Sequence, residues 1–430
     1  MLQPMKKTLL TGAIIFGIIA AMDFLPFVPI VSYTAAKIAS SILFLLFAYF
    51  LFRSVIPEKF VFGLLIAFFA LRLLYINAPP VGSDDLYRYL WDGKVQTEGI
   101  DPYLYAPNAP ELQRIGSELL PARVNHPDMQ TMYFPLSEWI FALGYLISGE
   151  QVWGYKLLLF FAELSTLAGL FLFLRKQKIE TKFILLYAAC PLIVFEYSVD
   201  GHVDLFGMTF LLFFLYHYLN KRYVTALILL GCSFSIKPAA LIVLPILFFA
   251  ERGWKKRFMI VFIPIITLGV QFLPYLFTSD PFVSLYAFTK HWTFNGFFYN
   301  LADLYFHNNQ PARIACGIAL LTAIGILSFS RISLLNKIYS GFLLLLLFSP
   351  IVHPWYIGWV TLFNPFMKKW SGIYYSAGAG LTGLTAMNYQ LYGVWKDYWP
   401  VLIIEYIPVL IFFVLEIKRM SHSTESNPIH

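Results

Sequence analysis

The stretch FVFGLLIAFFALRLLYINA, residues 60–78, carries a single charged side chain, Arg72, and runs directly into Pro79 and Pro80. An apolar run of this length can cross a bilayer as a helix. Similar runs recur throughout the 430 residues, of which 59% are hydrophobic and 13% are charged. A soluble domain carries roughly 25% charged residues. The sequence therefore predicts an all-α polytopic membrane protein and excludes a soluble domain.

Working outward from this run, we expect about 12–14 membrane spans in one transmembrane domain over residues 1–430. Several spans are shorter than the ~17 residues of a full crossing, so we expect tilted pairs or broken helices among them. The polar tail, residues 421–430, is expected to be disordered. The candidate spans are residues 9–24, 35–52, 60–78, 152–174, 183–199, 204–219, 223–236, 238–250, 258–277, 311–329, 338–352, 354–366, 371–388 and 400–417.

The basic residues predict the orientation of these spans. Of the 31 Lys and Arg residues, twenty fall on one side of the membrane when the N-terminus is cytoplasmic. The positive-inside rule then places both termini in the cytoplasm, in a multi-pass protein of the cell (inner) membrane. The net charge of +7 thus reflects topology, and we expect the lipid bilayer, and no nucleic acid, as a partner. The clusters are Lys6/Lys7, Arg53/Lys59, Arg175/Lys176/Lys178/Lys182, Lys221/Arg222, Arg252/Lys255/Lys256/Arg257, Arg331/Lys337, Lys368/Lys369 and Lys418/Arg419.

This orientation depends on one apolar segment, residues 133–148. If it crossed the membrane, all later basic clusters would lie outside. We therefore expect it to lie on the outer interface, as amphipathic helices do. Residues 79–151 then form one large outer loop, the only long hydrophilic stretch of the chain, which is the expected catalytic loop.

The start of this loop carries groups suited to acid–base and phosphate chemistry. Ser83 is a predicted helix N-cap, which puts Asp84 and Asp85 in the first turn. At helical spacing Asp85, Arg88, Tyr89 and Asp92 share one face. A carboxylate there can act as general base, and a guanidinium can hold a phosphate with two donors. The alternative is a surface helix with capping acids and an intrahelical salt bridge.

Aromatic and proline residues follow in the same loop. Tyr103 and Tyr133 flank a segment that contains His126 and Asp128. Flat rings of this kind give sugars an apolar face to stack on. The alternative is an aromatic belt at the membrane interface.

The loop also carries a longer pattern. The string DDLYRYLWDGKVQTEGIDPYLYAP, residues 84–107, resembles the first outer loop of bacterial GT-C glycosyltransferases. These are polyprenol-phosphate-mannose-dependent mannosyltransferases and, more distantly, GPI-anchor mannosyltransferases. The segments 126–136, 196–204, 237–238 and 349–356 fit the same pattern in the same order. The resemblance covers about residues 60–366.

The resemblance implies a GT-C-like helix bundle and an inverting glycosyltransferase. Its donor would be a hexose, mannose above all, on a polyprenyl phosphate, and its acceptor an envelope glycan or glycolipid at the outer face. Asp84 and Asp85 both match the region from which the family takes its reacting carboxylate, so either is the candidate catalytic base. Members differ in metal dependence. A divalent cation, Mg²⁺ or Mn²⁺, stays open, with Asp84 and Asp85 as its ligands if one binds.

Further site residues follow from the same motifs and from the cost of burying ionisable groups near a membrane. Arg88 is our first candidate for the donor phosphate, because its forked guanidinium suits phosphate better than a point charge. The alternative is that Arg88 only neutralises neighbouring acids. The other phosphate-binding candidates are Lys237, His202, His353 and Tyr356. The candidate substrate-binding residues are Tyr89, Trp91, Asp92, Tyr103, His126, Asp128, Tyr133, Asp204 and Trp355.

Two other functions fit a protein of this composition. A transporter or flippase of lipid-linked sugars predicts polar residues near the middle of the membrane and two matching halves. Here the polar groups gather at the outer ends of the spans, and no two-half symmetry is evident. A non-catalytic partner in envelope assembly predicts that Asp84 and Asp85 can be lost without effect.

Overall fold

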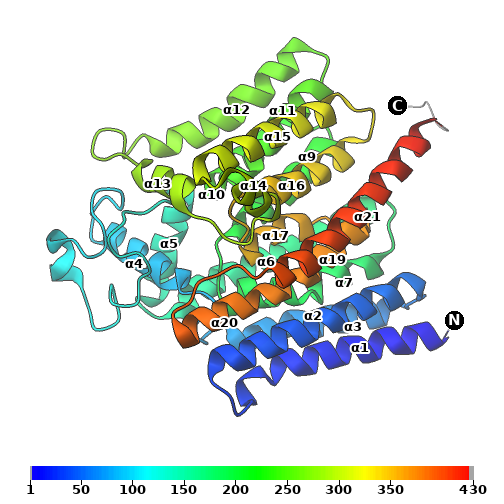
Figure 1. The fold of residues 1–430 in the computed structure, drawn as a ribbon, viewed down its shortest axis with the longest axis horizontal. Helices are drawn as coiled ribbons and strands as arrows, with labels where there is room; N and C mark the ends of the chain where they lie inside the picture. The colour runs from blue at the N-terminus through cyan, green and yellow to red at the C-terminus, as the bar shows by residue number, and fades with distance from the viewer. Residues whose placement is uncertain (1, 426–430) are drawn as a thin grey trace.

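The computed structural model describes residues 2–425, and within that range every named element is a helix. The only bridges of β type in this part of the chain join Phe294 and Asn295 to Ile351. Most helices run along one direction and form a single bundle (Figure 1). The sequence-based prediction of an all-α membrane protein is confirmed.

The first helices form one flank of the bundle and are drawn in blue in Figure 1. Their apolar faces meet so closely that Phe44, Phe47 and Leu51 are fully buried. The next helices belong to the expected outer loop. The elements of these two regions are α1 (Leu2–Ala20), η1 (Met22–Phe24), α2 (Pro29–Arg53), α3 (Glu58–Leu71), η2 (Arg72–Tyr75), α4 (Asp85–Thr97), η3 (Pro110–Ile115) and α5 (Pro135–Ser148).

The rest of the described chain completes the bundle with long and broken helices. Its elements are α6 (Val152–Lys176), η4 (Thr181–Ile184), α7 (Leu185–Ala188), α8 (Pro191–Ile193), η5 (Val194–Val199), α9 (Asp204–Leu219), α10 (Tyr223–Ile236), η6 (Pro238–Ile242), α11 (Val243–Ala250), α12 (Trp254–Phe272), α13 (Val283–His291), α14 (Phe297–Phe306), α15 (Asn309–Phe329), α16 (Leu334–Phe348), α17 (Pro354–Thr361), α18 (Asn364–Met367), α19 (Trp370–Gly378), η7 (Ala379–Thr382), α20 (Gly383–Tyr392) and α21 (Trp399–Glu425).

Each expected span is helical over most of its length, but few are long enough to cross a membrane alone. Within residues 2–425, α2, α6, α15 and α21 are long and apolar enough. A fifth span results if the pair Thr181–Ala188 and Pro191–Val199, bent by 53°, counts as one. The expected total of 12–14 spans stays a prediction. Of the predicted disordered tail, residues 421–425 continue helix α21, and residues 426–430 lie outside the described residues.

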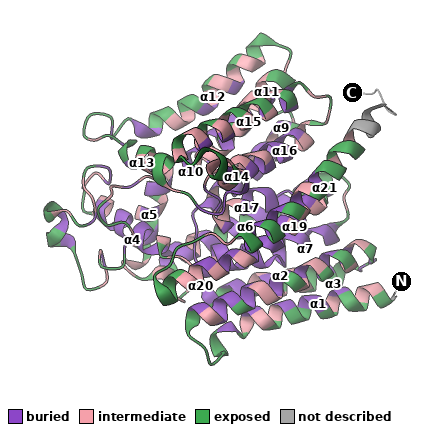
Figure 2. Ribbon diagram, in the orientation of Figure 1, coloured by how far each residue is buried: buried purple, intermediate pink, exposed green. Residues whose placement is uncertain are grey.

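Burial follows the pattern of a membrane bundle. Buried residues fill the centre, and exposed residues cover the outer helices (Figure 2). Many exposed side chains on α12, α15 and α21 are large and apolar, for example Phe262, Leu321 and Ile411. Water would solvate such a surface poorly, whereas lipid covers it at no cost, so these faces indicate contact with a bilayer.

Buried charges fix where the third span ends. Arg72 forms a buried ion pair with Glu163 on α6, at 2.8 Å. The Nζ of Lys156, also on α6, donates hydrogen bonds to the backbone oxygens of Tyr75, Ala78 and Val199. These oxygens belong to chain segments that end or break near the loop, so an ammonium satisfies acceptors that would otherwise be buried alone.

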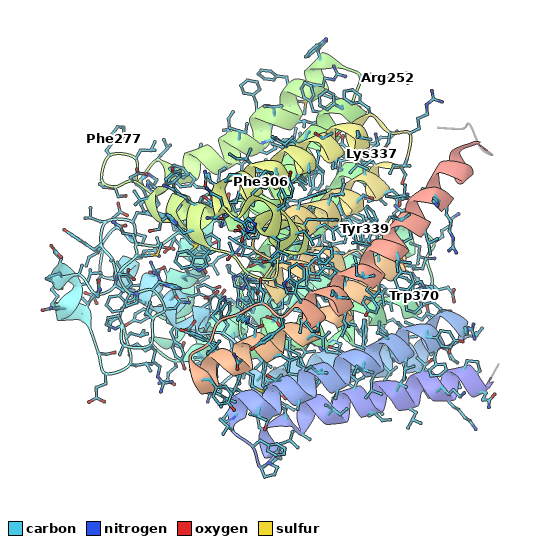
Figure 3. The ribbon with its side chains drawn as sticks, in the orientation of Figure 1. Arg252, Phe277, Phe306, Lys337, Tyr339 and Trp370 are labelled. Carbon is cyan, nitrogen blue, oxygen red and sulfur yellow. The ribbon has the colours of Figure 1, made fainter. Side chains whose placement is uncertain are left out.

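The loop helices α4 and α5 lie at the end of the bundle opposite to both chain ends (Figure 1). Helix α5 has 14 residues, or about 21 Å at 1.5 Å per residue, which is too short to cross a bilayer core of about 30 Å. Arg252 and Lys337 lie toward the end that carries the termini, and Phe277 lies at the α4 end (Figure 3).

Candidate active site

The N-terminus of α4 is fastened to the bundle by Asp200, which lies at the break after η5. Its Oδ1 accepts hydrogen bonds from the backbone N–H groups of Val81 and Gly82, at 2.9 and 2.8 Å. Its Oδ2 accepts a hydrogen bond from the hydroxyl of Tyr33 on α2, at 2.6 Å. A Cβ atom at Gly82 would lie 2.6 Å from Asp200 Oδ2, so this close approach requires glycine. The start of the predicted outer loop is thereby fixed in place.

The acid pair follows directly. Asp84 precedes α4 and is exposed, whereas Asp85 is its first residue and is partly buried. The side-chain amide of Asn125 donates to Oδ1 of Asp84 at 3.0 Å and to Oδ1 of Asp85 at 2.7 Å. One amide thus holds both carboxylates side by side.

The two carboxylates differ in proton affinity. Although Asp84 is exposed to the cavity, the surrounding protein displaces part of its hydration and so raises its pKa, and the negative charge of Asp85 raises it further. Burial also opposes ionisation of Asp85, but its contacts with His202 and Asn125 outweigh this and lower its pKa to about 2. Asp85 is therefore a permanent anion at neutral pH, and Asp84 is the better proton acceptor of the two.

Behind Asp85 lies a buried histidine that contacts two acids. Nδ1 of His202 is 3.6 Å from Asp85 Oδ2, and Nε2 is 3.6 Å from Glu196 Oε2. The ring stacks on Trp355 with 3.6 Å between centroids. Within the described chain neither ring nitrogen forms a hydrogen bond. His202 therefore lies between Asp85 and Glu196 and packs by ring stacking on Trp355.

Helix α2 supplies two groups that sequence analysis missed, Tyr33 and Lys37. Lys37 is buried and forms an ion pair with Glu196, and its Nζ also donates to the Tyr33 hydroxyl at 3.4 Å. A lysine and a tyrosine one turn apart in an apolar span was the available signal, because a buried lysine needs an anionic partner. The partner is 159 residues away, and no local pattern indicates it.

Arg88 and Lys237 are the two cationic candidates for binding the donor phosphate, and their surroundings differ. The Nε of Arg88 donates to both oxygens of Asp92, at 2.9 and 2.8 Å, and its Nη1 donates to the Met129 oxygen. This geometry favours the alternative in which Arg88 neutralises a neighbouring acid. Lys237 lies 3.6 Å from Asp204 and 4.5 Å from the Tyr356 ring centroid, with a side chain 20% exposed. Of the two cations, Lys237 therefore has the weaker contacts with neighbouring protein groups.

A cavity of about 830 Å³ brings many of these groups together. It is lined by residues from α2, the outer loop, the break at 196–200 and the second half of the chain. The predicted site residues in its wall are Asp84, Asp85, Arg88, His126, Asp128, Tyr133, Lys237, His353, Trp355 and Tyr356. Tyr33, Lys37, Glu196 and Asp200 also line it.

Other predicted site residues are buried outside the cavity wall, among them His202. Tyr89 stacks on Phe141 with 4.4 Å between ring centroids, and the Tyr103 hydroxyl donates to the Tyr133 oxygen. Trp91, Asp92 and Asp204 are also buried. Asp204 accepts a hydrogen bond from the Trp359 indole at 2.8 Å and faces Lys237. Their predicted role in substrate binding would be indirect, through residues that they support.

Two groups of acidic residues near the cavity are candidates for binding a cation. Glu196, Asp200 and His202 place their ligand atoms within 4.8 Å of one another. However, Glu196 is paired with Lys37, and Asp200 accepts hydrogen bonds on both oxygens, so a cation there would meet an ammonium group. These residues do not fit a resident metal. A cation at Asp84 and Asp85 stays a prediction.

The apolar bundle and its cavity, with carboxylates and an ammonium group at one end, define an integral membrane protein with a charged cavity. The family model that matches this chain is that of the MptA_B family, described as alpha-(1->6)-mannopyranosyltransferase, N-terminal domain. It matches residues 8–251, more than half of the chain, and the chain belongs to this family. No curated protein and no solved structure matches significantly.

Family membership makes this protein a mannosyltransferase, which confirms the resemblance to GT-C mannosyltransferases. A mannosyltransferase has a sugar donor and an acceptor, and the helices place it in a membrane. The matched range includes Asp84, Asp85 and Lys237. His353 and Trp355 lie beyond it and still reach the same cavity.

Proposed function

We propose that this mannosyltransferase moves mannose from a polyprenyl-phosphate donor to a hydroxyl of an envelope glycan or glycolipid at the outer face of the cell membrane. The observation that carries the proposal is the acid pair Asp84 and Asp85 in the wall of a cavity that also contains Lys237. The cavity lies among elements of the α4 end, away from both termini (Figure 1). The name of the family supports an α-(1→6) linkage in the product.

Asp84 is the general base of the proposed reaction. The acceptor oxygen attacks the anomeric carbon, the bond from that carbon to the phosphate oxygen breaks, and the hydroxyl proton passes to Asp84. The polyprenyl phosphate leaves with the bonding electrons. This single displacement inverts the anomeric configuration, so an α-linked product requires a β-linked donor. Asp85 stays ionised and stabilises the positive charge that develops on the sugar ring.

Lys237 stabilises the leaving phosphate. Negative charge on the phosphate grows as the glycosidic bond breaks, so a fixed ammonium group stabilises the transition state more than the ground state. Burial lowers the pKa of His353 to about 3, which keeps its ring neutral and able to donate one hydrogen bond. Tyr356, whose ring lies under the Lys237 ammonium, adds a hydroxyl beside the same cation.

The arrangement of the bundle supports the outer face as the place of reaction. Arg252 and Lys337, which belong to the basic clusters, lie toward the end that carries the termini (Figure 3). The positive-inside rule assigns such an end to the cytoplasm. A cavity at the opposite end then faces the side where nucleotide sugars are absent, which favours a lipid-linked donor.

The test uses the full-length protein in lipid nanodiscs, with radiolabelled polyprenyl-phosphate mannose as donor and an α-linked manno-oligosaccharide as acceptor. We expect label transfer from this donor and none from GDP-mannose, with an α-(1→6) linkage shown by NMR of the product. Transfer from GDP-mannose alone, or no consumption of the lipid donor, would refute the proposal.

A further inference from the structure

A ladder of aromatic rings leads from the acid pair to the surface of the second half of the chain. His353 stacks on Trp355 at 4.3 Å between centroids and on Phe294 at 4.9 Å. Phe294 packs against Trp395 at 4.7 Å, and Trp395 meets Tyr389 edge-on at 5.5 Å. All five side chains line the cavity. The ladder is thus continuous along one wall.

Burial changes along this ladder. Phe294 is 4% exposed, whereas Trp395 is 47% and Tyr389 is 51% exposed. Large rings this exposed in the wall of a cavity lack the partner that usually covers them. The open end of the ladder is therefore a binding surface, and the closed end stops beside the catalytic groups.

The backbone under the ladder is held by buried polar contacts. The N–H of Asn295 donates to Asp397 at 2.9 Å, and its side-chain amide donates to Glu405 at 2.9 Å. The Tyr406 hydroxyl donates to the Asn295 oxygen at 2.6 Å. Asn295 has φ of 53°, a left-handed conformation that costs free energy in a residue other than glycine. The contacts from the C-terminal segment stabilise this turn and so fix the Phe294 ring.

We propose that Trp395, Tyr389 and Phe294 form the binding platform for a carbohydrate acceptor. A pyranose ring has an apolar face of C–H groups that packs on an aromatic ring and an edge of hydroxyl groups that needs polar partners. The ladder supplies the rings, and other parts of the cavity wall supply polar groups such as Asn125, His126 and Gln390. A polyprenyl chain has no polar edge with which such groups could pair.

This inference rests on the proposed function, because it takes the acceptor hydroxyl to be the group that meets Asp84. The acid pair and Lys237 lie in the part of the chain that the family model matches, residues 8–251. The platform places recognition of the acceptor in the part beyond residue 251, where its three rings lie.

The first measurement is binding of α-linked mannotetraose, without donor, to the full-length protein in nanodiscs by saturation-transfer NMR. We expect Trp395→Ala to weaken binding about tenfold, Tyr389→Ala to weaken it about threefold, and Trp395→Phe to retain most of the affinity. The matched control is Tyr392→Ala. Tyr392 lies at the end of the same helix as Tyr389, its side chain is 72% exposed, and it does not line the cavity. This variant should bind as the wild type does.

The second measurement separates acceptor from donor. With polyprenyl-phosphate mannose, Trp395→Ala should raise the KM for the acceptor and leave the KM for the donor unchanged. Unchanged mannotetraose affinity in Trp395→Ala, an equal loss in Tyr392→Ala, or a rise in the donor KM instead would overturn the platform. If the lipid donor is inactive in the wild type, the proposed function fails, while the binding measurement still decides whether the platform holds a carbohydrate.

Discussion

The two sides of the cavity are built from different chemistry. The side from the first half of the chain is charged, with Asp84, Asp85 and the buried pair Lys37–Glu196. The side from the second half is aromatic, and its rings become more exposed toward Trp395. Charges that must act on a reacting bond need fixed, dry surroundings, whereas a surface that exchanges its ligand must stay open. In the proposed mechanism, bond breaking therefore takes place on the charged side and recognition of the acceptor on the aromatic side.

The largest effect on this division of roles is expected from a substitution in the acid pair. Asp84→Asn keeps the shape of the side chain and removes the base, so we expect kcat to fall roughly 10²- to 10⁴-fold. Binding of mannotetraose should not change, because the platform lies on the other side. The measurement is single-turnover transfer from the lipid donor, together with the NMR binding experiment.

Asp128→Asn is a matched control for that variant, since Asp128 is an exposed aspartate in the wall of the same cavity. Because Asp128 is a candidate substrate-binding residue, its loss should act on KM, and kcat should stay near the wild-type value if only the acid pair takes the proton. Turnover near the wild-type value in Asp84→Asn would remove this residue from the mechanism. An equal fall in Asp128→Asn would show that any lost charge in the cavity has the same effect.

The second prediction tests which of the two cations, Lys237 or Arg88, binds the leaving phosphate. Lys237→Met should lower kcat by roughly 10²- to 10³-fold, the effect of losing one donor to a developing anion. Arg88→Lys should retain turnover but lower the melting temperature, because a lysine cannot reproduce the contacts with Asp92 and the Met129 oxygen.

The two variants are compared by turnover and by thermal unfolding in the same nanodiscs. If Arg88→Lys lost turnover with its fold intact and Lys237→Met did not, the guanidinium would be the phosphate ligand, as its forked geometry first led us to expect. Circular dichroism at the assay temperature shows whether each variant is folded.

The sequence predicted the parts of this site that depend on local order. Asp85 lies in the first turn of α4, as the helix-start pattern indicated, but the N-cap position predicted for Ser83 is taken by Asp84, so the helix begins one residue later than expected. The resemblance assigned both acids and His353 to one site, and all three line the same cavity. Helical periodicity also placed Arg88 and Asp92 on one face, and the structure joins them in an ion pair. Which of two uses Arg88 serves could not be decided from spacing alone.

What sequence could not predict is which helix faces meet. Lys37 pairs with a residue 159 positions away, and Phe294 lies beside Trp395 only because the turn at Asn295 is held by α21 and the segment before it. These contacts depend on packing between elements, for which a single sequence carries no periodic signal.

The third prediction uses the pH dependence of the rate to test how the charge of Asp85 affects the pKa of Asp84. As general base, Asp84 must be ionised, so kcat/KM falls as pH drops through its pKa. The negative charge of Asp85 is one cause that raises that pKa above its usual value, after burial. Removing the charge by Asp85→Asn therefore lowers the pKa of Asp84, and the acidic limb of the rate profile moves to lower pH. The profile is measured on the residual activity, with donor and acceptor well below KM.

The direction of this move separates the two carboxylates. The pKa of Asp85 is about 2, so a limb due to Asp85 would lie below the pH range in which the protein can be assayed. A limb that disappears in Asp84→Asn and moves to lower pH in Asp85→Asn identifies Asp84 as the base and Asp85 as its charged neighbour. A limb that survives Asp84→Asn unchanged assigns the titration to another group and contradicts the proposed role of Asp84. This is the smallest of the three predicted effects, because Asp85→Asn changes the pH at which the rate declines and leaves the division between the two sides of the cavity unchanged.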